Sequence, residues 1–324
     1  MSREIVAVDI GGTNARFCRA RIEAGSPPEL GAIRKYKVAD YPGLAEAWQH
    51  FLRDDGGEAP SAAIAALAGP IDRTPIKMTN SHWVVDPVAL KAQMGLANLA
   101  LVNDFEAIAY GVAALPHAEL FSLFGPDNGL PEKGAISVIG PGTGLGVAII
   151  SMHPVGVRVL ATEGGHVEFA PVDEYEDALL AQLRVRFGRV STERVVSGPG
   201  LNALYQALGA LAGGDAPEHS DAELWQQALG SDSGLARRAL DQLCRSYGSV
   251  AGDLALAHGS KAVVLAGGLT GRMKDHPAFA LFAERFAAKG RYRDLMMKMP
   301  IYYADHPEMG LFGAAAAAQV LVSD

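Results

Sequence analysis

The chain of 324 residues is 49% hydrophobic and 20% charged, and it carries a formal net charge of −8. This composition excludes a disordered chain, and the length suits two folded domains better than one. The negative charge argues against a nucleic-acid partner, and no segment is long and apolar enough to predict a membrane span.

Apolar periodicity predicts strands and helices in alternation along the chain. Strands are expected at residues 4–9, 15–23, 31–38, 62–67, 98–103, 135–140, 146–151, 156–160, 262–266 and 300–304. Helices are expected at residues 42–53, 87–94, 105–115, 174–187, 198–210, 221–229, 233–257, 277–288 and 310–322. This order predicts an α/β fold with mixed sheets. The last helix contains five consecutive alanines and almost no charge, so we expect it to pack closely, back against the first domain.

The most informative segment is an apolar strand that ends in an aspartate and leads through a glycine turn into a second strand. It contains Val8-Asp9-Ile10-Gly11-Gly12-Thr13-Asn14. The glycines let the backbone turn tightly and approach a ligand. Thr13 and Asn14 can donate hydrogen bonds to phosphate oxygens, and Asp9 can hold a hydrated metal ion. Since no helix follows, the segment predicts a phosphate-binding hairpin rather than a Rossmann loop or a P-loop. An ordinary Gly-Gly hairpin is the alternative.

Two further glycine turns follow apolar strands. The turn at 140–146 again joins two strands, so the chain contains one strand–glycine–strand hairpin in each half. We expect Gly142, Thr143 and Gly144 to hold the outer phosphates of a nucleotide that is gripped from two sides. Gly267 and Gly268 follow the strand at 262–266 and are expected to lie under an adenosine, because glycine lets a base approach the backbone.

The strand at 98–103 ends in Asn103-Asp104, and a helix is expected to start at once. Asp104 is therefore expected at or near the helix N-cap, where backbone amides and the helix dipole favour its ionised form. A carboxylate in that place can accept a proton from a substrate hydroxyl, and Asn103 can hydrogen-bond a neighbouring hydroxyl. From these residues alone, a purely structural N-cap is an equally good interpretation.

Four further residues are candidates for binding a polyhydroxylated ligand. Glu163 and His166 flank two glycines, so both side chains can reach one small polar molecule. A lone histidine is more often structural, and the cysteine partners of a zinc site are lacking there. Glu193 equally fits the start of a helix. Asn80 follows an apolar stretch and is either a sugar contact or a turn residue.

The two cysteines, Cys18 and Cys244, lie in apolar segments and are expected to be buried core residues rather than a disulfide or a metal site. The N-terminus runs directly into a strand with no signal-peptide pattern. We therefore expect a cytoplasmic protein.

Taken in this order, the motifs resemble those of the bacterial ATP-dependent glucokinases of the non-repressor type, within the hexokinase–actin–heat-shock-chaperone ATPase superfamily. The resemblance runs from end to end of the chain. Its most specific segments are Glu163-Gly164-Gly165-His166 and Ser197-Gly198-Pro199-Gly200. The chain lacks the cysteine-rich zinc motif of the repressor-type sugar kinases, which separates it from them.

The resemblance implies a two-domain actin-like ATPase (ribonuclease H-like) α/β fold, with the sugar site in the interdomain cleft. A small domain would comprise residues 1–112 and 308–324, and a large domain residues 113–307. The family is typically a homodimer through the large domain. The implied reaction is phosphorylation of glucose by ATP to glucose 6-phosphate, the first step of glycolysis, with Mg²⁺ as the accompanying metal ion.

Carried over by position, Asp104 is the general base and Asp9 organises Mg²⁺, directly or through water. The implied substrate-binding residues are Asn80, Asn103, Asp104, Glu163, His166 and Glu193. The implied cofactor-binding residues are Val8, Asp9, Ile10, Gly11, Gly12, Thr13, Asn14, Gly142, Thr143, Gly144, Gly267 and Gly268. The sequence leaves two alternatives open: a kinase of another hexose, such as mannose or an amino sugar, and a nucleotide-switched sugar sensor.

Overall fold

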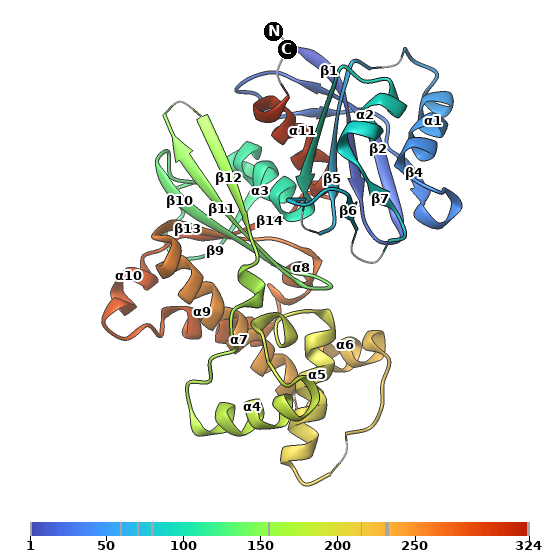
Figure 1. Ribbon diagram of the computed structural model, residues 1–324. Coiled ribbons are helices and arrows are strands. Elements are labelled where there is room, and N and C mark those ends of the chain that lie inside the picture. Colours follow the sequence, from blue (N-terminus) through green and yellow to red (C-terminus); the bar gives the residue numbers. More distant parts are fainter. Residues whose placement is uncertain are drawn as a thin grey trace. The chain divides into compact units, whose positions relative to one another are not determined.

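The computed structural model describes residues 2–58, 60–69, 71–78, 81–154, 156–214, 216–230 and 233–322. The chain separates into two compact units. The first comprises Met1–Glu119, Val157–Ala161 and His306–Asp324, and the second comprises Leu120–Gly156 and Thr162–Asp305. In Figure 1 the first unit contains both the blue strands from the start of the chain and the red helix from its end. The domain boundaries expected at residues 112 and 308 stay a prediction.

The first unit is built on a sheet with strand order β3-β2-β1-β5-β8, in which β4 also pairs with β2. These strands are β1 (Arg3–Ile10), β2 (Asn14–Ile22), β3 (Glu29–Leu30), β4 (Arg34–Lys37), β5 (Ala62–Leu67) and β8 (Asn98–Asn103). β2 is antiparallel to β1, whereas β1, β5 and β8 are parallel to one another. Every residue of β5 is buried, which is typical of a central parallel strand covered on both faces. A separate ribbon is formed by β6 (Ile76–Lys77) and β7 (Val84–Val85).

The α-helices described in the first unit are α1 (Leu44–Asp55), α2 (Pro87–Met94), α3 (Asp104–Ala114) and α11 (Met309–Leu321). α1 is followed by Gly56 and α2 by Gly95, both in the left-handed conformation that commonly ends a helix. The aromatic rings of Phe17, Trp48 and Phe51 are fully buried, and the Phe51 ring contacts both of the others, which joins α1 to the sheet.

The strands of the second unit follow the order β11-β10-β13-β14-β9. They are β9 (Leu120–Phe124), β10 (Gly134–Pro141), β11 (Leu145–His153), β13 (Ser260–Leu265) and β14 (Ile301–Ala304), and β12 (Gly156–Thr162) follows β11 in the chain. β10 and β11 form an antiparallel hairpin, β13 and β14 run parallel to β10, and β9 is antiparallel to β14. The centre of this sheet thus repeats the arrangement of the first, with a hairpin strand beside a parallel strand.

The helices described in the second unit are α4 (Glu174–Phe187), α5 (Gly198–Leu211), α6 (Asp221–Gly230), α7 (Leu235–His258), α8 (Gly268–Met273), α9 (Ala280–Ala287) and α10 (Arg293–Met297). The longest, α7, packs against α9 through Tyr247, whose ring meets Phe282 edge-on at a centroid distance of 4.9 Å. Of the helices in the described residues, none combines the length and the apolar character needed to cross a membrane.

Most of the expected elements are present, and both strand–glycine–strand hairpins are confirmed. The strand expected at 31–38 is wrong at its start, because only Arg34–Lys37 pairs with β2, while Gly31 donates its N–H to Arg19 O. The helix expected at 277–288 begins as the 3-10 turn Pro277–Phe279 and becomes α-helical at α9. β9 is not predicted from the sequence, because a short apolar run without alternation identifies neither strand nor helix. Cys18 and Cys244 are both buried and unbonded, as expected.

Helix α11 packs against α3 and also contacts β1, β2 and β5. The approach to α3 is very close, since a Cβ on Gly313 would lie 2.0 Å from the Ala107 carbonyl oxygen, and one on Gly111 would lie 3.1 Å from the Gly313 Cα. The two helix backbones are therefore in contact, which only glycine permits. The alanine run of α11 is buried, so the expected close packing of the last helix is confirmed.

Gly313→Ala is expected to destabilise the first unit, because the new methyl group would meet a main-chain oxygen that moves only if α3 shifts. The free energy of unfolding should fall by about 1–3 kcal/mol, the usual cost of overpacking, as measured by urea denaturation. Gly230→Ala, at the end of α6, is the control, because a Cβ there meets no described atom within 4 Å. Equal stability of the two variants would contradict the close helix crossing.

Candidate functional site

The first glycine turn joins β1 to β2 and is closed by a backbone hydrogen bond. Gly11 N–H donates to Asn14 O at 2.9 Å, and the side chain of Thr13 is exposed on the turn. Val8 and Ile10 are fully buried in the core of the first unit. The side chains of Val8 and Ile10 are therefore closed to a ligand, whereas Thr13 offers its hydroxyl.

Asp9 lies one residue before the end of β1 and directly opposite Arg16 in the antiparallel ladder. Opposite residues share one face of a sheet, and here Arg16 Nη1 is 3.6 Å from Asp9 Oδ2. Burial raises the pKa of the Asp9 carboxyl above its usual value. The charge of Arg16 opposes this rise, and the charges of Asp104 and Glu308 add to it. Asp9 is therefore a part-buried carboxylate in a strongly charged setting, which is common at functional sites.

The start of α11 lies against Asp9. A Cβ on Gly310 would be 2.7 Å from Asp9 Oδ2, so glycine leaves the room that the carboxylate occupies. Arg16 Nη1 also donates to Glu308 Oε2 at 3.2 Å. The sequence contains no signal for Gly310 or Glu308, because their contact with β1 depends on the fold. Arg16 is different, since a short turn between two strands places it opposite Asp9.

β8 ends at Asn103, and α3 begins at Asp104. The N-cap is Asn103, whose Oδ1 accepts hydrogen bonds from Phe105 N–H at 2.9 Å and Glu106 N–H at 3.1 Å. Glu106 completes a capping box by accepting from Asn103 N–H. Asp104 is the first helical residue, and its Oδ1 accepts from Phe105 N–H at 2.8 Å. The cap therefore does not require Asp104, whose carboxylate lies at the positive end of the helix.

The side-chain amide of Asn103 is fixed at both ends. Its oxygen serves the helix cap, and its Nδ2 donates to Gly69 O at 3.1 Å. An amide nitrogen carries two hydrogens, and this bond occupies one of them. Asn103 thus combines a structural role with a donor that is held in a defined direction.

The second glycine turn joins β10 to β11. Gly142 N–H donates to Gly144 O at 2.8 Å, and Gly198 N–H donates to Gly142 O at 2.8 Å, so α5 begins beside the turn. Leu145 N–H donates to Glu193 Oε2 at 2.9 Å. A Cβ on Gly144 would lie 2.4 Å from that same oxygen. The carboxylate of Glu193 therefore lies directly on the turn, a contact that sequence reasoning missed.

Glu163 and His166 are brought together by the 3-10 turn Gly164–His166, in which His166 N–H donates to Glu163 O at 2.9 Å. His166 Nε2 is 3.7 Å from Glu163 Oε2, and the side chains are 55% and 71% exposed. A Cβ on Gly165 would lie 2.2 Å from Leu145 O, so the turn lies against the start of β11. Both polar side chains are open to a ligand from one surface of the second unit.

Backbone hydrogen bonds join the segment of Glu193 to that of His166. Thr192 N–H donates to Val167 O at 2.8 Å, and Thr192 Oγ1 donates to the same oxygen at 3.2 Å. Glu193 lies within the 3-10 turn Thr192–Arg194, and the N-cap of α5 is Ser197. Glu193 is therefore not the cap of the helix that follows, and its carboxylate serves the glycine turn.

Gly267 is the residue at which β13 gives way to α8. Its φ of 83° lies in the left-handed region, and a Cβ there would be 2.9 Å from Pro141 O, so the position requires glycine for two reasons. Gly268 is the first residue of α8, and outside its own helix no described atom lies within 4 Å of its Cβ position. This third turn thus opens a short helix, whereas the other two lead into strands.

The predicted site residues divide between the two units. The first unit contains Asp9, the turn at 11–13, Asn103 and Asp104, and the charge of Asp104 adds to the rise in the pKa of Asp9. The second unit contains the turn of Gly142, Thr143 and Gly144, together with Glu163, His166, Glu193, Gly267 and Gly268. In the second unit Leu145 contacts both the Glu193 carboxylate and the Gly165 turn. Asn80 lies outside the described residues.

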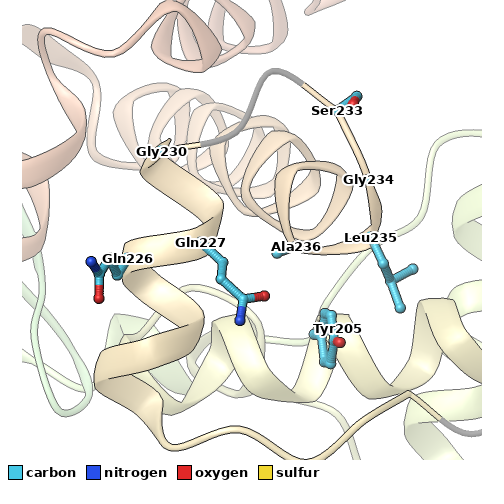
Figure 2. Close-up of a pocket in the computed structure, with 8 residues that line it drawn as sticks. All are labelled: Tyr205, Gln226, Gln227, Gly230, Ser233, Gly234, Leu235 and Ala236. Carbon is cyan, nitrogen blue, oxygen red and sulfur yellow. The ribbon is translucent and has the colours of Figure 1, made fainter.

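Figure 2 shows a pocket of about 670 Å³ in the second unit, where Tyr205 of α5, Gln227 of α6 and Leu235 of α7 meet. Its lining includes none of the residues that the sequence predicts to bind substrate or cofactor. Its described lining residues also include no charged side chain. Because charged partners form the strongest hydrogen bonds to phosphate and carboxylates are the usual ligands of Mg²⁺, the candidate site is assigned to the glycine turns and their carboxylates rather than to this pocket.

Comparison with known proteins decides the family. The model of the Glucokinase family matches residues 6–321. A glucokinase of Zymomonas mobilis subsp. mobilis is 45% identical over 314 residues, covering 97% of each chain. The chain belongs to the glucokinase family. A glucokinase of Stenotrophomonas maltophilia strain R551-3 is 38% identical over 98% of this chain and 95% of its own.

Solved structures of glucokinases agree with this assignment. The glucokinase of an Antarctic psychrotroph has a TM-score of 0.86 and 33% identity, with 98% of each chain covered. The Leishmania braziliensis glucokinase, at 19% identity, shows the shared fold alone, with a TM-score of 0.80 over 98% of this chain and 93% of its own. The identification made from the sequence and the predicted actin-like α/β fold are both confirmed, and the chain is a kinase of the glucokinase family.

Proposed function

We propose that this member of the glucokinase family transfers the terminal phosphoryl group of ATP to the primary hydroxyl of glucose, producing glucose 6-phosphate and ADP in the first step of glycolysis. The observation that carries the proposal is Asp104, a carboxylate at the carboxyl end of β8 whose helix is capped by its neighbour Asn103. Asn103 supplies the cap, and the Asp104 carboxylate lies at the positive end of α3, which favours its ionised form. It also lies in the same unit as Asp9 and the first glycine turn.

Asp104 acts as the general base. Its carboxylate accepts the proton of the primary hydroxyl as the hydroxyl oxygen attacks the terminal phosphorus. The bond from that phosphorus to the bridging oxygen breaks, and ADP leaves. Because the transition state of phosphoryl transfer is loose, the other residues contribute mainly by positioning the reactants and by neutralising charge.

The two glycine turns hold the phosphates. In the first turn, the backbone amide of Gly12 and the side chains of Thr13 and Asn14 act as donors, while the Gly11 N–H closes the turn by donating to Asn14 O. In the second turn, Thr143 and Gly144 act as donors, and the exposed Gly142, whose N–H is bound to Gly144 O, lets a phosphate approach the backbone. Gly267 and Gly268 border the adenosine, where the open Cβ position of Gly268 leaves room for the ribose and base.

Asp9 holds Mg²⁺, directly or through a water molecule. The residue fits this role because carboxylate oxygens are preferred by Mg²⁺, and this carboxylate is 20% exposed with Arg16 nearby to favour its ionised form. Gly310 leaves space beside it. The bound ion would neutralise negative charge on the phosphates. The protein's own contribution is to hold the Asp9 carboxylate in place at the end of β1.

Glucose hydroxyls are bound by Asn103 and Asp104 in the first unit and by Glu163, His166 and Glu193 in the second, with Asn80 as a further contact. Carboxylates accept hydrogen bonds from hydroxyls, and imidazole and amide groups can also donate to them. Glu163 and His166 suit this role because their side chains are close together and exposed. The location of the sugar in an interdomain cleft stays a prediction.

The proposal also covers the domain boundaries, the oligomeric state and the cellular compartment. The small domain comprises residues 1–112 and 308–324, and the large domain comprises residues 113–307. Two chains form a homodimer through the large domain. The enzyme acts in the cytoplasm, where its two buried thiols remain reduced.

Asp104→Asn is expected to lower kcat by about 10²-fold or more, because the amide cannot accept the hydroxyl proton. A coupled assay with ATP measures kcat on glucose, mannose and N-acetylglucosamine. The parent enzyme should prefer glucose. Asp221→Asn, at the exposed first position of α6, is the matched control and should leave kcat unchanged. Near-parental turnover of Asp104→Asn would remove Asp104 from the mechanism. A parent enzyme that prefers another sugar would overturn the assigned substrate.

Gly142→Ala separates a phosphate site from a structural turn. No described atom lies within 4 Å of the Cβ position of Gly142, so the melting temperature should not change. If a phosphate approaches this backbone, the methyl group should raise the KM for ATP about fivefold or more, since overpacking typically costs about 1–3 kcal/mol. Gly214→Ala, in an equally open position, should change neither quantity. An unchanged KM for ATP in Gly142→Ala would argue against phosphate binding at this turn.

Glu193→Ala and His166→Ala form a second matched pair. Both are expected to raise the KM for glucose. Glu193→Ala also removes the acceptor of Leu145 N–H, so the second glycine turn loosens and the KM for ATP should rise by at least about threefold. His166→Ala should leave the KM for ATP unchanged, because the ion pair described for its side chain is with Glu163 and not with the turn. Equal KM values for ATP in both variants would contradict the coupling of Glu193 to the turn.

A further inference from the structure

Arg16 stands between two carboxylates in the first unit, and one of its nitrogens faces both of them. Arg16 Nη1 is 3.2 Å from Glu308 Oε2 and 3.6 Å from Asp9 Oδ2. The first distance is that of a hydrogen bond, and the second is not. All three side chains are partly buried, with exposures of 37% for Arg16, 32% for Glu308 and 20% for Asp9. Dissolved ions therefore screen the interactions among these three charges less than they screen a fully exposed ion pair.

Glu308 is held in place by its own backbone. Its N–H donates to His306 Nδ1 at 3.2 Å, and its carbonyl accepts from Phe312 N–H at 2.9 Å. Glu308 is the N-cap residue of α11, yet its side chain makes no capping hydrogen bond to the helix. The side chain is directed to Arg16 instead, while the backbone around it is anchored at the start of α11.

Nη1 carries two hydrogens, but in this structure it lies within hydrogen-bond distance of Glu308 and not of Asp9. If the bond to Glu308 were absent, Arg16 would be free to close the short remaining gap to Asp9, which lies opposite it in the ladder. Carboxylate–guanidinium pairs form strong charge-assisted hydrogen bonds. A bond of that kind would occupy the Asp9 oxygen that a hydrated cation needs.

We infer that Glu308 is a positioning residue for the metal-binding carboxylate: by holding Arg16 through a hydrogen bond, it keeps the guanidinium from closing onto Asp9. This inference rests on the proposed role of Asp9 in holding Mg²⁺. Arg16 then stays near enough to balance the charge of Asp9 but too far away to compete with the ion. Helix α11 thus contacts the first glycine hairpin through its N-cap residue Glu308 as well as through Gly310.

The test measures Mg²⁺ binding apart from turnover. Isothermal titration calorimetry gives the Kd of the non-hydrolysable analogue AMPPNP with and without Mg²⁺, in the presence of glucose, and the ratio of the two values reports the contribution of the ion. The variants are Glu308→Gln, Arg16→Gln, the double variant and Asp9→Asn. Glu4→Gln is the matched control, because it removes one negative charge from an arginine pair on the same hairpin, away from Asp9. Melting temperatures establish that each variant is folded.

Glu308→Gln is expected to reduce the gain from Mg²⁺ by at least about threefold, since groups in contact couple measurably. In the Arg16→Gln background the same substitution should have no effect, because the cation that Glu308 restrains is gone. Glu308→Asp, which keeps the charge, should recover part of the gain. Parental behaviour of Glu308→Gln, or an equal loss with and without Arg16, would overturn the inference. If Asp9→Asn itself retains the full gain from Mg²⁺, the proposed role of Asp9 fails instead.

Discussion

The arrangement around Asp9 depends on how closely α11 approaches the rest of the first unit. At Gly313 the backbones of α11 and α3 are in contact, and at Gly310 the start of the helix leaves room for the Asp9 carboxylate. A side chain at Gly313 would push α11 away from α3, and one at Gly310 would meet the Asp9 carboxylate of β1. The same approach carries Glu308 to within hydrogen-bond distance of Arg16. Because these two residues are glycines, α11 lies close enough to place Glu308 beside the first glycine turn.

A different constraint organises the second unit, where main-chain hydrogen bonds join segments that carry the polar residues. Thr192 connects the segment of Glu193 to that of His166, and Leu145 connects the Glu193 carboxylate to the turn of Gly142–Gly144. Buried or partly buried amides need partners, so these bonds are costly to break. Residues assigned to sugar and residues assigned to phosphate are in this way parts of one rigid assembly within the unit.

Charge is distributed so that the carboxylates have different surroundings. Asp9 is part-buried, and the pKa of its carboxyl is raised by burial and lowered by Arg16. Asp104 lies at the N-terminus of α3, where the helix dipole favours an anion, and Asn103 is the residue that caps the helix. Glu193 is held by an amide of the second turn. These differences fit the roles proposed for the three carboxylates, with Asp104 as a base, Asp9 as a ligand of a cation and Glu193 as a residue that orients the sugar and the second turn.

Local patterns in the sequence by themselves determined much of this protein. The two strand–glycine–strand hairpins, the start of α3 at Asn103-Asp104 and the family follow from short segments whose residue types dictate their backbone. Only the tertiary structure decided which distant residues reach those segments. Arg16 and Glu308 are 292 positions apart, and Leu145 and Glu193 are 48 apart. No periodicity or turn signal encodes such contacts, because they exist only after sheets and helices have assembled and close-packed glycines have set the distances between them.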